Sequence, residues 1–241
     1  MKTNHVVALA AVTIAMVTSL SVGGVAQAPA TPDQMVAALK QNLAESQKNL
    51  RKYEWVETTT ISLKGEEKSR KQQRVYYGAD GTLTKLPIGE PQPQAAQSGG
   101  GRRGRIKEKV AEDKKEEMQD YMERASKLIH LYVPPSPTQI QKAKDAGNMA
   151  LQPQQGNVRV EFQNFIQPSD MLAITVDAKA ALPSALSVAT YLDKPEDAVM
   201  LGVRFATLAD GTNYTAQTTL DAKAKNIRVV VENSGYRPLA P

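Results

Sequence analysis

A two-residue alternation of apolar and polar side chains constrains the fold of this chain more than any other feature. Val158, Val160 and Phe162 alternate with polar residues, and residues 199–205 repeat the pattern. Successive side chains of a strand point to opposite faces, so each run buries one face of a sheet. Asp210-Gly211 lies between two such runs and is a strong hairpin signal. Consecutive strands joined by short turns predict an antiparallel sheet, not a parallel nucleotide-binding one.

The alternation recurs through both halves of the chain. It begins at Tyr53, where Trp55, Ile61 and Leu63 share one face before a turn at Gly65. Strands are also expected at 70–77, 82–88, 158–163, 171–176, 186–192, 199–205, 214–220 and 227–231.

Three segments have helical spacing instead. Thr31 and Pro32 form a helix start, and the apolar residues that follow as far as Leu50 recur at helical intervals. Residues 106–131 predict a long helix, densely charged in its first half and apolar along one stripe of its second half. Pro134-Pro135 ends that helix, and a short helix then runs to Gly147. The helical region is therefore expected to span 106–147.

Residues 89–105 are rich in Gly, Pro, Gln and Arg, which predicts a flexible, disordered insert. Its glycines match the dinucleotide-binding pattern, but no parallel strand precedes them, so no cofactor is predicted. Arg102, Arg103 and Arg105 are candidates for contact with an anionic membrane surface, whereas nucleic acid is not an expected partner. The alternative is a solvated linker without a partner.

The first 28 residues are typical of a cleavable secretory signal peptide. A mildly positive start precedes a short apolar core, and Ala26-Gln27-Ala28 fits the signal peptidase pattern. We therefore expect cleavage after Ala28, a periplasmic or secreted location, and a single mature domain over residues 29–241.

The composition restricts the available chemistry. The chain has no Cys and two His, of which His5 lies in the signal peptide. Thiol chemistry and disulfides are excluded, and His130 alone cannot form a multi-histidine zinc site. We interpret His130 as structural, and Asp193, Glu196 and Asp197 as an exposed turn. No catalytic residue, metal or cofactor is predicted.

The layout of one amphipathic helix, an antiparallel sheet and helices inserted mid-chain resembles the periplasmic lipoprotein-carrier superfamily of LolA and RseB type. The most similar segments are 39–63 and 199–220. The resemblance implies an α+β fold, with a curved antiparallel sheet that forms an open half-barrel covered by helices. It also implies a concave face that holds acyl chains or lipid-like groups.

These observations lead to a carrier-like binding protein without catalysis, whose partner is a lipid or lipoprotein. The side chains expected to line the concave face are Trp55, Ile61, Val160, Phe162, Val203, Phe205, Met118, Met122 and Ile129. The alternative is an envelope scaffold protein, in which the sheet is only a packed core. The charged helix and the Arg-rich insert would then contact a partner or an anionic membrane. An enzyme of another type is a third, weaker alternative, since few catalytic groups are available.

Overall fold

The computed structural model describes residues 32–89 and 102–239, and the side chains of 37–89 and 116–239 within them. The predicted signal peptide, its cleavage site and residues 90–101 of the predicted insert lie outside the described residues. The strands are β1 (Tyr53–Leu63), β2 (Glu66–Tyr77), β3 (Leu83–Pro87), β4 (Met149–Gln154), β5 (Asn157–Gln163), β6 (Met171–Asp177), β7 (Leu182–Tyr191), β8 (Ala198–Thr207), β9 (Asn213–Ala222) and β10 (Ile227–Pro238).

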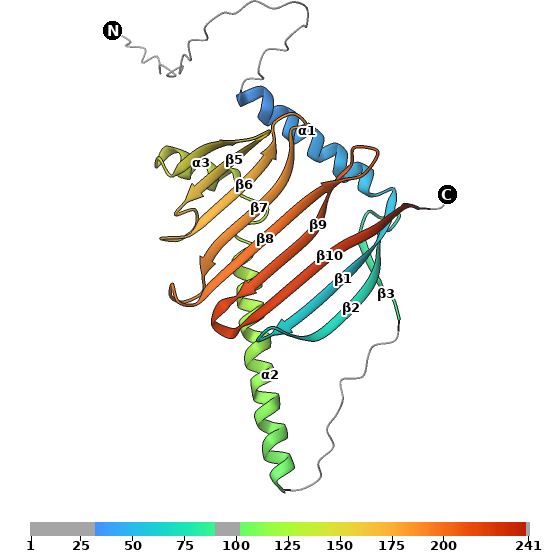
Figure 1. The fold of residues 1–241 in the computed structure, drawn as a ribbon, viewed down its shortest axis with the longest axis vertical. Coiled ribbons are helices and arrows are strands. Elements are labelled where there is room, and N and C mark those ends of the chain that lie inside the picture. The colour runs from blue at the N-terminus through green and yellow to red at the C-terminus, as the bar shows by residue number, and fades with distance from the viewer. Residues whose placement is uncertain (1–31, 90–101, 240–241) are drawn as a thin grey trace, which may run out of the picture.

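All ten strands form one curved antiparallel sheet in the order β3-β2-β1-β10-β9-β8-β7-β6-β5-β4 (Figure 1). Most neighbours are consecutive along the chain, whereas β10 returns to pair with β1 and joins the two halves. The sheet is open, with β3 and β4 as its edges. The predicted fold class, an open curved antiparallel sheet covered by helices, is confirmed.

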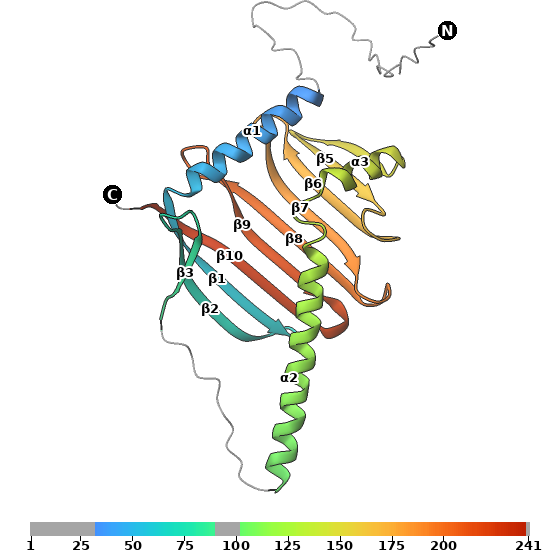
Figure 2. The same cartoon turned by 180° about the vertical axis from the view of Figure 1, so that it is seen from behind.

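The helices are α1 (Pro32–Leu50), α2 (Arg102–Ile129) and α3 (Pro137–Asp145), with a 3-10 turn η1 (Lys223–Lys225). Seen from behind, α1, α2 and α3 lie on the same face of the sheet, which we call the inner face (Figure 2). Hydrogen bonds from Asn42 and to Ser46 hold α1 to the strand ends. Asn42 Nδ2 donates to Ala180 O at 2.9 Å, and the Asn213 backbone N–H donates to Ser46 Oγ at 3.1 Å.

The inner face contains two apolar cores. The first includes Phe162, Leu172, Val188 and Leu201 from β5 to β8, packed against Tyr132 after α2 and Ala143 of α3. In the second, Tyr121 and Ala125 of α2 pack on the ends of β8, β9 and β10, through Val199, Ala222 and Ile227. Helical spacing puts Tyr121 and Ala125 on one side of α2, so that a single stripe seals this end of the sheet.

A buried carboxylate fixes the chain segment that follows α2. Asp170 is 2% exposed and accepts hydrogen bonds from the backbone N–H groups of Phe165, Ile166 and Gln167 at 2.5, 2.9 and 2.8 Å. The hydroxyl of Tyr132 donates to the same carboxylate at 2.5 Å. Burial, and then this bond to Asp170, raise the pKa of Tyr132 above its usual value. These four donors satisfy a charge that would otherwise be costly to bury.

Some boundaries differ from the sequence prediction. β4 was not expected, and β10 continues to Pro238 instead of ending near residue 231. α2 begins at Arg102, not at residue 106, so Arg102, Arg103 and Arg105 belong to its first turns instead of the loop. Their side chains lie outside the described set. None of the helices in the described part has the length and apolar character needed to cross a membrane.

Asp170→Ala is expected to lower the free energy of unfolding by about 3 kcal/mol or more, because buried donors left without an acceptor each cost about 1–3 kcal/mol. Urea unfolding followed by the emission of Trp55, the single Trp, measures this change. Asp145→Ala is the control, since the exposed Asp145 accepts one bond, from Gln141. A control as destabilised as Asp170→Ala would contradict the anchoring role of Asp170.

Candidate functional site

The inner face is sealed at the end where α2 crosses β1, β8, β9 and β10. Tyr121 donates from its hydroxyl to Asp197 Oδ1 at 2.7 Å, and Arg124 forms an ion pair with Asp193 at 2.5 Å. Lys225 of η1 pairs with Glu117 at 2.5 Å and lies 5.7 Å from the Tyr121 ring centre. These contacts hold α2 against the loops at this end. The predicted exposed turn at 193–197 therefore serves as an anchor for α2.

An aromatic cluster lies toward the opposite end of the inner face. It consists of Tyr53, Trp55, Tyr77, Tyr214 and Tyr236. Trp55 and Tyr236 stack with ring centres 5.3 Å apart, and Tyr214 lies 4.3 Å from Tyr236.

Polar contacts orient this cluster. Trp55 Nε1 donates to Asn233 Oδ1 at 3.1 Å, and Asn233 Nδ2 donates to Thr215 O at 2.9 Å. The Tyr53 hydroxyl donates to Asp210 Oδ2 at 2.7 Å. The guanidinium of Arg51, next to the end of α1, lies 5.9 Å from the Tyr77 ring centre. These contacts fix the rings in place, so the aromatic cluster closes the end of the inner face opposite α2.

Between the two ends, the middle of the inner face is only partly covered. We call this region the inner strip; it consists of Thr59, Ile61, Thr218 and Val231. The β1–β10 register pairs Ile61 with Val229 and Thr59 with Val231, and Thr218 pairs with Val231 on β9. Ile61 is 39% exposed, and the other three are half-buried. The strip is thus an apolar and hydroxyl-bearing surface that retains contact with solvent.

A partly exposed ion pair borders the inner strip on the side of the aromatic cluster. Lys85 of β3 reaches across β2 and places its Nζ 2.7 Å from Glu57 Oε1 and 2.8 Å from Oε2. Glu57 is 13% exposed and Lys85 40%. Glu57 precedes Thr59 on the same face, so a polar boundary adjoins the apolar strip.

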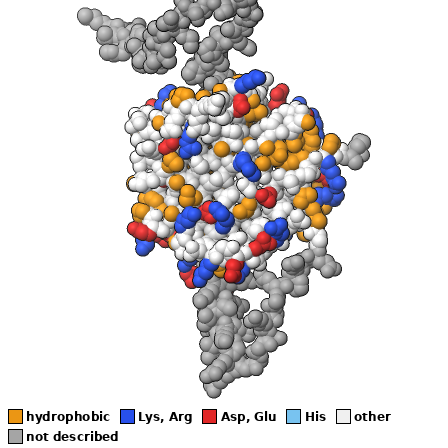
Figure 3. Space-filling view, in the orientation of Figure 1, with side chains coloured by type: hydrophobic (Ala, Val, Ile, Leu, Met, Phe, Trp, Pro, Cys, Tyr) orange, Lys and Arg blue, Asp and Glu red, His pale blue; other side chains and the backbone are white. Residues whose placement is uncertain are grey.

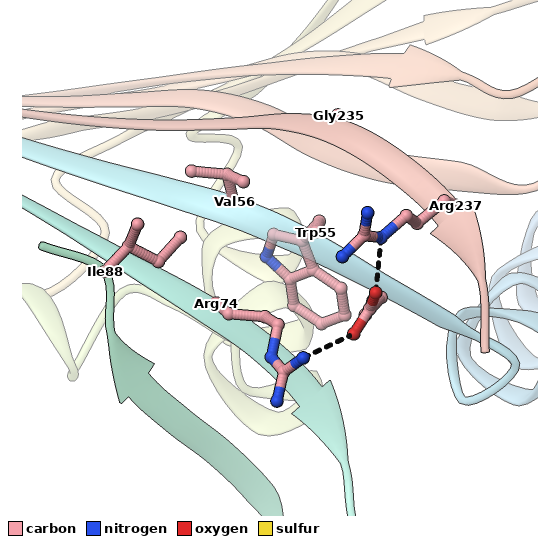
Figure 4. A pocket seen from close by; sticks show the side chains of 7 residues that line it. Trp55, Val56, Arg74, Ile88, Gly235 and Arg237 are labelled. Atoms are coloured by element: carbon pink, nitrogen blue, oxygen red, sulfur yellow. Dashed lines mark hydrogen bonds and ion pairs between the residues drawn. The ribbon is translucent and has the colours of Figure 1, made fainter. Parts of the chain in front are cut away.

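The outer face contains two shallow hollows. The first, of about 130 Å³, is lined by Glu54, Val56, Arg74, Ile88 and Arg237 beside Trp55 and Gly235 (Figure 4). Arg237 donates to Glu54 Oε1, and Arg74 lies 3.8 Å from Glu54 Oε2. The cations thus already have an anionic partner, which makes this hollow a poor anion site.

The second hollow has a volume of about 250 Å³ and lies over β6 to β9 between Met171 and Met200. Gly202 contributes to it, since nothing lies within 4 Å of the position a Cβ would take there. Elsewhere this face carries charged side chains scattered among uncharged ones (Figure 3). Both volumes lie below the roughly 300–1,000 Å³ of small-molecule pockets.

The residues predicted to line a concave face are divided among several environments. Phe162 is buried in the first core, and Val160, Val203, Phe205 and Ile129 pack against it. Met118, Met122 and Ile129 pack against the second core. Trp55 belongs to the aromatic cluster, and Ile61 alone among them lies in the inner strip. Most of the predicted residues therefore serve the packed interior beneath the helices.

Tyr214 and Tyr236 belong to the site region but were not among the predicted residues. Tyr214 could have been found from the sequence, because it lies at the start of the strand that follows the Asp210-Gly211 turn. No sequence pattern indicated Tyr236, because Gly235, at φ +64°, interrupts the alternation of β10 one residue earlier. Tyr76 precedes Tyr77 in β2 but is not part of this cluster: it pairs with Glu54 on the outer face, and its ring centre lies 5.7 Å from the guanidinium carbon of Arg74.

Two titratable groups of the described region, His130 and Asp170, are engaged in structural contacts. His130 is exposed, and its Nδ1 lies 2.6 Å from Ser126 O on its own helix. Asp170 is enclosed by four donors, as described above. No group of three or more His, Cys, Asp or Glu able to hold a metal occurs in the part of the chain that the structure describes.

No protein-family model and no curated protein matches this sequence. Among solved structures, a DUF1329 family protein from Desulfovibrio piger has 10% identity and a TM-score of 0.37, over 85% of this chain and 92% of its own. A LolA superfamily protein from Nitrosomonas europaea has 8% identity and a TM-score of 0.37, over 84% and 94%. A chain of the Pseudomonas aeruginosa MucA/MucB complex has 11% identity and a TM-score of 0.20, over 85% and 100%.

One of these structures is thus a protein of the LolA superfamily, which the sequence layout resembles. TM-scores this low leave function to be argued from the chain's own residues.

Tyr236→Phe is expected to reduce the loss of stability at alkaline pH. Burial, and then the neighbouring Tyr214, Tyr77 and Glu57, raise the pKa of Tyr236 above its usual value near 10. The unfolded chain ionises this tyrosine first, so its contribution to stability is present below pH 10 and is lost as pH rises beyond it. Urea unfolding at several pH values above about 10 measures how steeply the free energy of unfolding falls with pH.

Tyr76→Phe on the outer face is the matched control for this measurement. Identical slopes for the parent chain and for Tyr236→Phe would contradict the assignment of a raised pKa to the inner cluster.

Proposed function

We propose that this chain is an exported, carrier-like binding protein that holds a hydrophobic ligand against the inner strip, without catalysis. The observation that carries the proposal is the exposure of Ile61, at 39%, on a face that is packed shut at both ends. An apolar side chain left open between the α2 end of the inner face and the aromatic cluster offers favourable burial to an apolar ligand, at about 25 cal/mol per Å².

The shape and chemistry of the strip favour an elongated ligand. Its side chains come from β9, β10 and β1, so they follow one another across adjacent strands. Strands in a sheet lie about 4.8 Å apart, so an extended acyl chain could contact all three. The Glu57–Lys85 pair at the border could receive a polar head group. These features support a lipid, or the lipid group of a lipoprotein, as the ligand.

Export is part of the proposal. The predicted signal peptide over residues 1–28 supports a periplasmic or secreted location, where lipid groups in transit need shielding from water. The absence of Cys from the sequence is compatible with an oxidising compartment, since no free thiol is exposed to it.

Ile61→Lys is expected to weaken binding of an apolar fluorescent dye and of co-purified lipid at least tenfold, because it places a charge within the strip. Met200→Lys is the matched control, since Met200 is 44% exposed on the outer face. Dye titration and native mass spectrometry of the purified protein provide the measurements. Failure of the parent chain to bind dye or lipid, or equal weakening by both substitutions, would contradict the proposal.

A second candidate function is supported by the position of α2. The N-terminal part of this helix projects beyond the sheet in both views (Figures 1 and 2). The projecting part begins with Arg102, Arg103 and Arg105, so it could reach an anionic membrane or a protein partner. In this scaffold role the inner face would serve only as a core.

Replacing Arg102, Arg103 and Arg105 by Gln separates the two functions. A scaffold that contacts membranes should lose binding to vesicles containing anionic lipid, whereas a carrier should keep its affinity for the apolar dye. Co-sedimentation with anionic and with neutral vesicles measures the first property. Unchanged vesicle binding in the triple variant would rule out these arginines as the membrane contact.

A further inference from the structure

The outermost strand β4 presents unpaired backbone groups along the edge of the sheet. Gln163 N–H donates to Asn148 O at 2.9 Å, which makes these two residues a hydrogen-bonded pair. Hydrogen-bonded pairs alternate along an antiparallel ladder, so Ala150 and Gln152 direct their backbone groups toward β5. Met149 and Leu151 therefore direct their N–H and C=O groups away from the sheet, as Pro153 does with its C=O.

The side chains of β4 do little to protect this edge. Leu151 pairs with Val160, so it lies on the inner face, and it is 58% exposed, the highest value among large hydrophobic side chains in the described part. No charged residue occurs from Met149 to Asn157. Native sheets commonly protect an edge with charge, and Lys in particular. The one protective device in β4 is Pro153.

The opposite edge, β3, has the same arrangement of outward backbone groups but differs from β4 in one side chain. Ile88 N–H donates to Gln72 O at 2.9 Å, so the outward residues of β3 are Leu83, Lys85 and Pro87. These correspond in order to Met149, Leu151 and Pro153 of β4. The central position is thus a lysine on one edge and a leucine on the other.

We propose that β4 pairs antiparallel with β4 of a second copy of this chain, centred on Leu151. In this register the two Leu151 residues exchange a pair of backbone hydrogen bonds. Met149 N–H of each copy donates to Pro153 C=O of the other, so the missing N–H of proline removes one possible bond at each end. The pairing forms four hydrogen bonds and sets the two Leu151 side chains next to each other on the inner face.

Self-complementarity identifies the occupant of this edge as a second copy. A two-fold axis through Leu151 matches every outward donor of one strand with an acceptor of the other. The same operation on β3 would bring two Lys85 residues directly opposite one another, and opposed like charges disfavour pairing. The two edges therefore differ at the position that decides whether a strand can pair with itself.

The dimer would continue the sheet from one chain into the next, with ten strands from each. The inner strip lies on β1, β9 and β10, several strands away from β4, so pairing would leave it accessible. The inference thus goes beyond the proposed function, and either can fail without the other.

Sedimentation velocity of the full chain over a concentration series tests the dimer. The parent chain should show concentration-dependent dimerisation, and Leu151→Lys should weaken it at least tenfold. Leu83→Lys is the matched control, because Leu83 is 45% exposed on the other edge. Urea unfolding checks that both variants remain folded. A parent chain that stays monomeric, or a dimer that Leu151→Lys does not weaken, would overturn the proposal.

A cysteine at the same position tests the register. The chain has no Cys, so Leu151→Cys introduces a single thiol. Opposed residues of a hydrogen-bonded pair have Cα atoms about 5.5 Å apart, within the range that a disulfide spans. Mild oxidation should therefore cross-link Leu151→Cys and spare Leu83→Cys. Equal cross-linking of both variants contradicts pairing through β4. Cross-linking of neither variant also contradicts it, and any dimer would then have to form through another surface.

Discussion

The contact between α2 and one end of the inner face determines what the rest of the sheet can do. Tyr121 and Ala125 bury Val199, Ala222 and Ile227 at the ends of three strands, and ion pairs to the adjacent loops hold the helix there. Because α2 covers that end and α1 is tied to the other, the central strands keep a partly solvated apolar strip. A helix laid along the middle of the sheet would have closed this surface.

The position of α2 depends in turn on the chain segment that leaves it. Tyr132 lies in the turn just after α2, which ends at Ile129, and its hydroxyl donates to Asp170 within the first core. A carboxylate in an apolar core is tolerated only with all its acceptor sites used, which restricts this segment to the one path that supplies four donors. Phe165, which donates to Asp170, also packs its ring near that of Tyr132, 6.1 Å away. Apolar packing and a polar network thus specify the same geometry.

The sequence predicts the sheet well because its strands are sorted by burial. Val158, Val160 and Phe162 alternate with polar residues for the reason that one face meets the helices, and this periodicity is visible without a structure. The same periodicity does not predict β4. Residues 149–154 contain a proline and are almost all exposed, since an edge strand buries little on either face. Only the pairing with β5 reveals it.

The candidate site was harder to predict, because inward orientation does not distinguish a packed residue from an accessible one. Phe162 and Ile61 both face inward, yet one lies under α3 and the other in the open strip. The difference depends on where α2 and α3 lie, which is set by long-range contacts such as Tyr132 with Asp170. The sequence also did not predict the first residues of α2. Gly104 and its neighbouring arginines favour a loop locally, although a single glycine costs a helix only about 1 kcal/mol.

The residues that stabilise the fold and those of the proposed binding strip occupy separate places in this arrangement. The two cores and the aromatic cluster bury their side chains at the ends of the inner face, and none of them needs a ligand to complete its packing. Ile61 and Val231, by contrast, contribute less to stability than fully buried residues, because part of their surface stays in water in the folded state. The sheet can therefore remain folded while the strip is empty. If the strip binds an apolar ligand as proposed, its preformed side chains would require little ordering when that ligand arrives.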